Sequence, residues 1–428
     1  MLVGTKTRRV AIVGGTRIPF ARGHGAYAEV GNPQMLTAAL AGLVERFGLR
    51  GQCVGEVAAG AVIKHPSQWN LARECVLDSG LAPQTPAVDL QRACGTSLEA
   101  AILVANKIAL GQIDAGIAGG VDTVSDPPIG FPRSFQRLLL RSHRGRTAGA
   151  RIAPWLGLRP RHFKPVLPGV AEPRTGLSMG ESTEWMVKQW RIPREEQDRL
   201  ALQSHRNASA AYAEGFYSDL VIPYLGLARD DNVRDDTSLE KLARLSPVFD
   251  RSAGGTLTAG NSTPMTDGAS AVLLASEAWA RARDLPVLAY LAYGKVAAVD
   301  YVDHREGLLM APAYAVPRML ADAGLALTDF DFYEIHEAFA GQVLCTLKAW
   351  TDPAFCRDRL GRSEVLGAID RAKLNVKGGS VAIGHPFAAT GTRIVATLAK
   401  VLAESGAKRG LISICTAGGM GVTAILER

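Results

Sequence analysis

Cys94 is placed where a thiol could act as a nucleophile. It lies in DLQRACGTSLEAA, after an apolar stretch and directly before an expected helix. A cysteine at a helix N-terminus feels the positive end of the helix macrodipole, which lowers its pKa and favours the reactive thiolate. The alternative is a small buried hydrophobic residue, the usual state of a free cysteine. Position alone leaves both interpretations open.

Two residues near the C-terminus could assist such a thiol. His385 lies in GGSVAIGHPFAATG, where the many glycines offer little packing reason for an imidazole. Its side chain titrates near neutral pH and could hold a cysteine as thiolate, although a structural role for it stays open. Cys415, in ISICTAGGMG, ends an apolar strand and could carry a proton, since thiol pKa values lie not far above neutral. On its own, Cys415 would be interpreted as a core residue.

A third polar residue, His336, lies in FYEIHEAFA at the end of another expected strand. The sequence predicts no metal site, because the helix-borne H-E-x-x-H pattern is missing and none of the 6 cysteines forms C-x-x-C. GMGVTA (419–424) and residues 23–28 fit a dinucleotide fingerprint by eye, but no strand–turn–helix unit surrounds either. We therefore expect no cofactor.

The elements that must position these residues repeat along the chain. Strands are expected at 9–15, 57–63, 87–90 and in AGIAGGVDT, and helices at 35–47 and 97–110. A helix at 390–404 is then followed by a strand, paired glycines and a second strand. Both regions have the order reactive residue, helix, strand, Gly-Gly. This order predicts a duplicated α/β unit whose Val/Ile/Ala-rich sheets are buried between helix layers.

The first of these halves is interrupted. We assign 1–125 and 250–284 to the N-terminal half, 126–249 to an inserted loop domain, and 285–428 to the C-terminal half. The insertion is rich in Pro, Arg and Gly and has one clear helix, within 194–215.

Positive charge is concentrated in part of this insertion. The chain has 48 Lys+Arg against 41 Asp+Glu. Between Pro127 and Thr175 the only acid is Glu172, and the ten basic residues are Arg133, Arg137, Arg141, Arg144, Arg146, Arg151, Arg159, Arg161, Lys164 and Arg174. The apolar residues interleaved with them are Leu138, Leu139, Leu140, Trp155, Leu156, Leu158 and Phe163.

Basic and apolar residues mixed in short helices suit an anionic surface: CoA phosphates, a membrane face or an acidic partner. The alternative is a solvated loop with its arginines on the outer face. The segment has no recognisable nucleic-acid module, so we expect no nucleic-acid partner.

Composition narrows the class of protein. A hydrophobic content of 47% excludes global disorder, and no run reaches the roughly 18 apolar residues of a membrane span. MLVGTKTRRVAIVGG has no apolar signal core, so it is interpreted as a mature start. The scattered cysteines suit a reducing cytoplasm. The basic and apolar segment 127–175 suits an additional, peripheral contact with a membrane.

Together these motifs resemble the thiolase family over essentially the whole chain. The cysteine before a small-residue helix start, HEAFA, GGSVAIGHPFAATG and CTAGGMG occur in family order near family spacing. Each motif alone is moderately specific, and the ordered set is highly specific. PRSFQRLLLR, FKPVLPGVAEPRTGLSMGESTEWM and HEAF, where many thiolases have Asn-Glu-Ala-Phe, are similar to the β-subunit of the fatty-acid-oxidation trifunctional enzyme and its bacterial relatives.

The resemblance implies a five-layered αβαβα fold with an inserted loop domain. It also implies a 3-ketoacyl-CoA thiolase (acetyl-CoA C-acyltransferase) with coenzyme A as substrate and no cofactor. Cys94 would attack the 3-keto carbon, and His385 would activate it. Cys415 would protonate the acetyl-CoA enolate and later take the CoA thiol proton. His336, in the family's usual Asn position, would hold an ordered water or donate at the enolate oxygen.

The resemblance further implies how oxygen and substrate are held. Backbone N–H groups of Cys94 and Ala417 would form a second oxyanion site. The expected tunnel residues are Met179, Asn261, Ser262, Thr263, Met310 and Phe339. Family members are homodimers or homotetramers, and a hydratase/dehydrogenase α-subunit is an implied partner.

Three alternatives remain at this stage. The first is an acetoacetyl-CoA thiolase of biosynthetic or short-chain type. The second is a ketosynthase-like condensing enzyme, which does not need Cys415. The third is a non-catalytic acyl-CoA or lipid carrier, which has no reason to keep two reactive cysteines.

Overall fold

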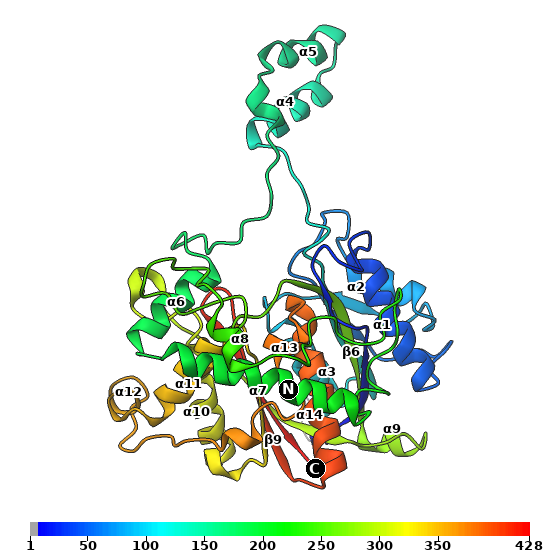
Figure 1. Ribbon diagram of the computed structural model, residues 1–428. Helices are drawn as coiled ribbons and strands as arrows, with labels where there is room; N and C mark the ends of the chain where they lie inside the picture. Colours follow the sequence, from blue (N-terminus) through cyan, green and yellow to red (C-terminus); the bar gives the residue numbers. More distant parts are fainter. Residues whose placement is uncertain (1–6) are drawn as a thin grey trace.

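The computed structural model describes residues 7–428, so the first part of the expected mature start lies outside the described residues. The strands run in the order β4-β3-β5-β6-β1-β7-β10-β9-β8, with β2 paired to β6, and helices cover the sheet (Figure 1). The strands are β1 (Val10–Arg17), β2 (Ala21–Arg22), β3 (Val57–Ala59), β4 (Ala87–Asp89), β5 (Ala115–Asp122), β6 (Thr266–Ser276), β7 (Ala289–Ala298), β8 (Phe332–Ile335), β9 (Arg409–Thr416) and β10 (Met420–Glu427).

The helices frame this sheet and build the insertion. The α-helices are α1 (Asn32–Arg46), α2 (Leu71–Asp78), α3 (Thr96–Ala109), α4 (Arg133–Arg144), α5 (Ala148–Ile152), α6 (Met179–Gln189), α7 (Arg194–Ala213), α8 (Leu239–Ala243), α9 (Glu277–Arg281), α10 (Ala311–Ala323), α11 (Ala340–Thr351), α12 (Pro353–Asp358), α13 (Ser380–Ile383) and α14 (Thr390–Ser405). The 3-10 helices are η1 (Ala153–Gly157), η2 (Pro160–Phe163), η3 (Val302–His304), η4 (Leu327–Asp329), η5 (Arg371–Lys373) and η6 (Phe387–Ala389).

The two halves of the sheet have the same pairing pattern. In the first half, β1 is antiparallel to β6, β6 is antiparallel to β5, and β5 is parallel to β3. In the second half, β7, β10, β9 and β8 repeat this order and these senses. A parallel bridge between Tyr333 and Leu374 lies where β4 lies in the first half. The predicted duplication of an α/β unit is therefore confirmed.

Helices separate the halves into five layers. Helix α1 packs on the outer face of the first half, α10 packs on the outer face of the second, and α3 and α14 lie between them. Alternate residues of β6 divide between two layers: Leu273 packs with α1, whereas Leu274 packs with α3 and α14. Because every residue of β1, β5 and β6 is buried, these strands are apolar on both faces, as a sheet between helix layers requires.

Two sequence-based details were wrong. The strand expected at 57–63 ends at Ala59, because the N–H groups of Val62 and Ile63 bind the Asp122 carboxylate instead of a neighbouring strand. The glycines of AGIAGGVDT lie inside β5 and do not end it. A Cβ at Gly120 would lie 2.1 Å from the Ala388 carbonyl oxygen, so only glycine lets the 385–389 loop approach β5 this closely.

The insertion leaves and re-enters the sheet between neighbouring strands, since β5 and β6 pair directly. Its expected helix is α7, and the chain also forms α4, α5, α6 and α8 there. The proposed domain boundaries stay predictions. Within the described part of the chain, no helix is both long and apolar enough to cross a bilayer.

Residues 127–175, which we call the arm, project away from the body (Figure 1). Gly130 and Val166 pair across its stalk through two backbone hydrogen bonds of 2.9 Å. At its tip, the rings of His162 and Phe163 pack on Phe135, which is buried. The arm therefore folds around a small core of its own.

Candidate active site

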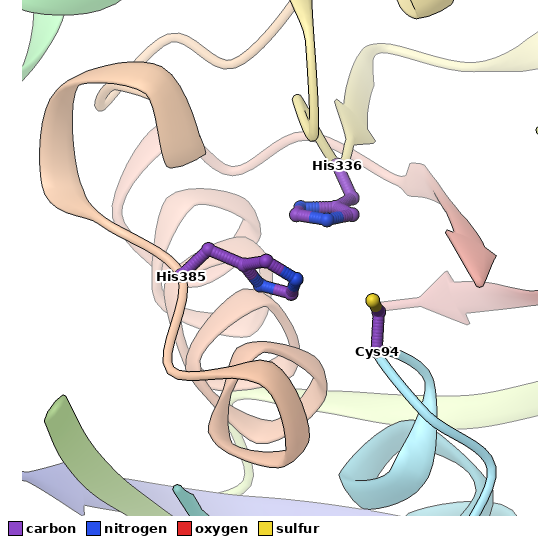
Figure 2. A group of neighbouring side chains, drawn as sticks. All are labelled: Cys94, His336 and His385. Carbon is purple, nitrogen blue, oxygen red and sulfur yellow. The ribbon is translucent and has the colours of Figure 1, made fainter. Parts of the chain in front are cut away.

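Cys94, His336 and His385 converge on one point from three elements (Figure 2). Cys94 precedes α3, His336 follows β8, and His385 precedes α14. One ring nitrogen of each histidine and the Cys94 sulfur lie within 4.8 Å of one another, and the two imidazole centroids are 4.1 Å apart. Since α3 and α14 pack together in the central layer, the residues before these helices meet although each half supplies only one.

Cys415 joins this group from β9. The neighbouring strand β8 ends just before His336, whose N–H donates to the Ser413 carbonyl at 2.9 Å. Cys415 is buried, and burial together with the nearby Cys94 raises its pKa well above the ordinary thiol value. All four predicted catalytic residues are thus brought together, and Cys415 is a protonated thiol in the resting protein.

The expectation that the Cys94 pKa is depressed was wrong. Burial raises the pKa of Cys94 to about 12, although the N–H groups of Ala417 and of Cys94 itself act in the opposite direction. A helix terminus contributes about 0.3–1 kcal/mol, which is less than one pKa unit at about 1.4 kcal/mol per unit. Burial can shift a pKa by up to about 3–5 units, so even the partial burial of Cys94 outweighs the helix terminus, and the resting group is a thiol.

The two backbone N–H groups that lower this pKa are the ones predicted to form the second oxyanion site. They point at the sulfur from the start of α3 and from the turn after β9. Their use by a thioester oxygen stays a prediction.

Both histidines are neutral. Burial and the nearby Arg393 lower the pKa of His385 to about 3, and burial lowers that of His336 well below its ordinary value. Among the described residues, Nε2 of each ring is buried without a hydrogen-bond partner. The Nδ1 atom of His385 lies 2.5 Å from Thr390 Oγ1, and that of His336 lies 2.7 Å from Ser380 Oγ.

The loop that carries His385 is held by residues 265–266, which follow the insertion and lead into β6. The His385 N–H donates to Thr266 Oγ1 at 2.7 Å, and His385 forms a parallel bridge with Met265. Gly384 adopts φ 108°, a left-handed conformation that favours glycine. The position of His385 therefore depends on contacts between the second half of the fold and the start of β6 in the first half.

The expected tunnel residues fall into two groups. Met310, Phe339 and Cys415 belong to one apolar cluster, against which Met179 packs. Ser262 pairs with Phe339, and Thr263 Oγ1 donates to the Ser380 carbonyl at 2.8 Å.

Asn261 is engaged by protein groups. Its amide donates to Asp198 at 2.9 Å, and its oxygen accepts the N–H of Thr258. This side chain therefore shapes the wall of the site without a free polar atom for substrate. That a tunnel runs between these groups stays a prediction.

A cavity of about 340 Å³ beside the catalytic loop was not predicted. Its lining includes Arg22, Arg234, Lys241, Asn232 and Val381. Val381 directly follows Ser380, so the cavity opens next to the residues that hold His336. Asn232 is buried, and neither polar atom of its amide has a partner among the described residues. No clear signal in the sequence marked this cavity, because residues 229–244 contain four basic and five acidic side chains.

Comparison with known proteins decides the family. The family model described as thiolase, N-terminal domain, matches residues 10–278, and the thiolase, C-terminal domain, matches 285–428. The chain belongs to the thiolase family. The predicted resemblance and fold are confirmed, and this thiolase is an acyltransferase.

Named relatives span the whole of this thiolase. A 3-ketoacyl-CoA thiolase of Pectobacterium atrosepticum is 42% identical over 432 residues, covering 100% of this chain and 98% of the relative. A 3-ketoacyl-CoA thiolase of Yersinia pestis is 41% identical with the same coverage. The crystal structure of the Bacillus anthracis acetyl-CoA acetyltransferase matches with a TM-score of 0.83 and 30% identity, covering 99% of this chain and 100% of that one.

Cys94, His336 and His385 also supply the donor types that Zn²⁺ prefers. Two neutral imidazoles beside two neutral thiols equally suit proton transfer, since each imidazole can accept or donate at Nε2. The absence of a metal from the reaction stays a prediction.

Proposed function

We propose that this thiolase is a 3-ketoacyl-CoA thiolase of fatty-acid β-oxidation, which cleaves 3-ketoacyl-CoA with CoA. The observation that supports this most is the pair of thiols, Cys94 and Cys415, beside two neutral histidines. One thiol can carry an acyl group while the other exchanges a proton with carbon. The names of the full-length relatives agree with this activity.

The first half-reaction makes the acyl-enzyme. The Cys94 sulfur attacks the 3-keto carbon while its proton passes to Nε2 of His385. The bond between C2 and C3 then breaks, its electron pair forms the enolate of acetyl-CoA, and the acyl group stays on Cys94. Cys415 gives its proton to C2, so acetyl-CoA leaves and Cys415 becomes a thiolate.

The second half-reaction restores the enzyme. The Cys415 thiolate takes the proton of the incoming CoA thiol, and the CoA sulfur attacks the thioester on Cys94. Cys94 leaves as a thiolate and recovers its proton from His385. The backbone N–H groups of Cys94 and Ala417 would stabilise the oxygen of the tetrahedral intermediate.

We infer that the CoA phosphates bind at the cavity next to Val381. Arg22 and Arg234 supply two guanidinium groups there, which fit phosphate geometry well, whereas the third cation, Lys241, pairs with Asp236 of the same lining. The cations of the arm lie on a segment that projects away from the body (Figure 1). This differs from the expectation that the arm faces the CoA phosphates.

The proposed activity predicts a chain-length profile. CoA-dependent loss of 3-ketoacyl-CoA absorbance, measured from C4 to C16, is expected to rise with acyl length and to survive EDTA treatment. Activity confined to C4 would instead indicate an acetoacetyl-CoA thiolase, and loss with EDTA would indicate a metal. No turnover at any length would favour the acyl-CoA carrier.

The arm suits contact with an anionic surface. Its exposed apolar side chains include Leu140, Ile152, Trp155, Leu156, Leu158 and Phe163. Its single acid, Glu172, is buried at the root, where it accepts hydrogen bonds from the Gly418 N–H and the Tyr301 hydroxyl. Glu172 therefore does not neutralise the positive charge on the exposed part of the arm. We propose a cytoplasmic homodimer or homotetramer whose arm contacts a membrane, with a hydratase/dehydrogenase α-subunit as partner.

The membrane contact predicts salt-dependent vesicle binding. The protein is expected to sediment with vesicles of anionic phospholipid at low salt, to detach at high salt, and to ignore neutral vesicles. Leu156, 86% exposed at the arm tip, should matter most, so Leu156→Ser should weaken binding. Val365→Ser, on the exposed surface of the body, is the matched control. Failure to bind at low salt would exclude the membrane contact. The arm would then be a docking site for an acidic partner or a solvated loop.

A further inference from the structure

His336 and His385 face the same thiol but need opposite properties. In the proposed reaction, which this inference takes as given, Nε2 of His385 must accept a proton, and Nε2 of His336 is expected to donate a hydrogen bond at the enolate oxygen. Burial keeps both rings neutral, so each carries a single N–H. What each ring can do at Nε2 is therefore decided by its tautomer, and the tautomer is decided by the partner of Nδ1.

The partner of His336 is itself bound to a cation. Ser380 Oγ lies 2.7 Å from His336 Nδ1 and accepts a hydrogen bond from Arg393 Nη2 at 2.8 Å. All three residues are buried. Within the described residues, the hydrogen bonds of Ser380 Oγ end on these two groups.

This arrangement leaves one direction for the serine hydrogen. A guanidinium can only donate, so Arg393 occupies a lone pair of Ser380 Oγ. The remaining polar neighbour of the hydroxyl is Nδ1 of His336. A buried hydroxyl without an acceptor would be costly, so Ser380 donates to Nδ1 and the ring hydrogen of His336 sits on Nε2.

The Arg393 guanidinium also lies near a carboxylate. Its guanidinium Nη1 lies 3.8 Å from the Glu334 carboxylate, and Glu334 is on β8, the strand that ends before His336. Arg393 itself is on α14, the helix that follows His385. One cation thereby connects the strand that precedes His336 with the helix that follows His385.

The corresponding hydroxyl of His385 has no such donor. Thr390 Oγ1 forms its hydrogen bond with Nδ1 of His385, and in the described structure no cation donates to it. Thr390 can therefore accept the Nδ1–H or donate its own hydrogen to Nδ1, so no cation fixes the tautomer of His385 as Arg393 fixes that of His336.

We propose that Ser380, oriented by Arg393, is a positioning residue that holds His336 as its Nε2–H tautomer, a hydrogen-bond donor to the substrate oxygen. The family's usual asparagine at this position would need no such control, because an amide nitrogen always donates. The Ser380–Arg393 pair should therefore matter only when position 336 is histidine.

Nitrogen NMR on the unmodified enzyme tests the tautomer directly. The protein is labelled with ¹⁵N-histidine, and the signals lost in His336→Asn are assigned to His336. A protonated Nε2 and a bare Nδ1 are expected in the wild type. A protonated Nδ1 would overturn the proposal, whether or not the enzyme performs thiolysis.

A double-mutant cycle separates positioning from mere structure. Ser380→Ala is expected to lower kcat for thiolysis about three- to ten-fold, the worth of one neutral hydrogen bond, with KM little changed. Ser380→Thr, which keeps the hydroxyl, should restore kcat. In the His336→Asn background Ser380→Ala should have no further effect, and an equal loss in both backgrounds would contradict the proposal.

Discussion

Replacing Cys94 with alanine is expected to abolish thiolysis, lowering kcat/KM by roughly 10⁴–10⁶-fold, as loss of a nucleophile does in other enzymes. Cys94 is the thiol towards which both histidines and two backbone N–H groups are directed. The absorbance assay measures turnover, and intact mass after mixing with 3-ketoacyl-CoA measures acylation. The wild type should gain one acyl group, and Cys94→Ala should gain none.

Cys53→Ala is the matched control for Cys94→Ala, because Cys53 is a free, exposed cysteine outside the site. It should keep both turnover and acylation. An acyl group on Cys94→Ala would place the nucleophile elsewhere. A wild type that binds substrate without ever becoming acylated would favour the non-catalytic carrier.

Cys415→Ser is expected to lower thiolysis by about 10²–10⁴-fold, the usual worth of a general acid or base. A serine hydroxyl in this buried position gives up its proton far less readily than a thiol. A ketosynthase-like enzyme would keep most of its activity, since it needs one cysteine with two histidines, or with a histidine and an asparagine. Steady-state thiolysis, measured beside the rate of Cys94 acylation, distinguishes the two.

Cys345→Ser controls for the cost of burying a hydroxyl. Cys345 and Cys415 are both buried in the same apolar cluster, so both substitutions should lower the thermal midpoint. Only Cys415→Ser should lower activity in the protein that remains folded. Retention of most thiolysis by Cys415→Ser would exclude Cys415 as the proton carrier and refute the proposed reaction.

Local features of the sequence were enough to single out four candidate residues that the structure brings together, and their catalytic roles stay a prediction. Cys94 and His385 each precede a helix whose start is marked by small residues, and His336 and Cys415 each lie at the end of an apolar strand. These signals can be read from the sequence because each depends only on a few neighbouring residues. The order of elements around them also predicted the duplicated α/β unit, because periodicity and turn residues act within each element.

Properties that depend on distant contacts could not be predicted in this way. The helix start at Cys94 suggested a lowered pKa, but burial raises it, and Cys94 packs against an apolar cluster whose residues come from both halves of the fold. The paired glycines of β5 were expected at its end, whereas Gly120 is required by the close approach of Ala388, more than half the chain away. The cations around the cavity likewise come from separate segments.

The sequence alone determined which side chains are available for chemistry and which elements carry them, since those follow from local residue types and spacing. Only the tertiary structure decided their protonation, their tautomers and the direction of the arm. Burial and hydrogen-bond partners set the first two, and both depend on residues such as Arg393 and Ser380 that meet His336 across packed elements. The arm's direction depends on how its stalk leaves the body, which no local pattern encodes.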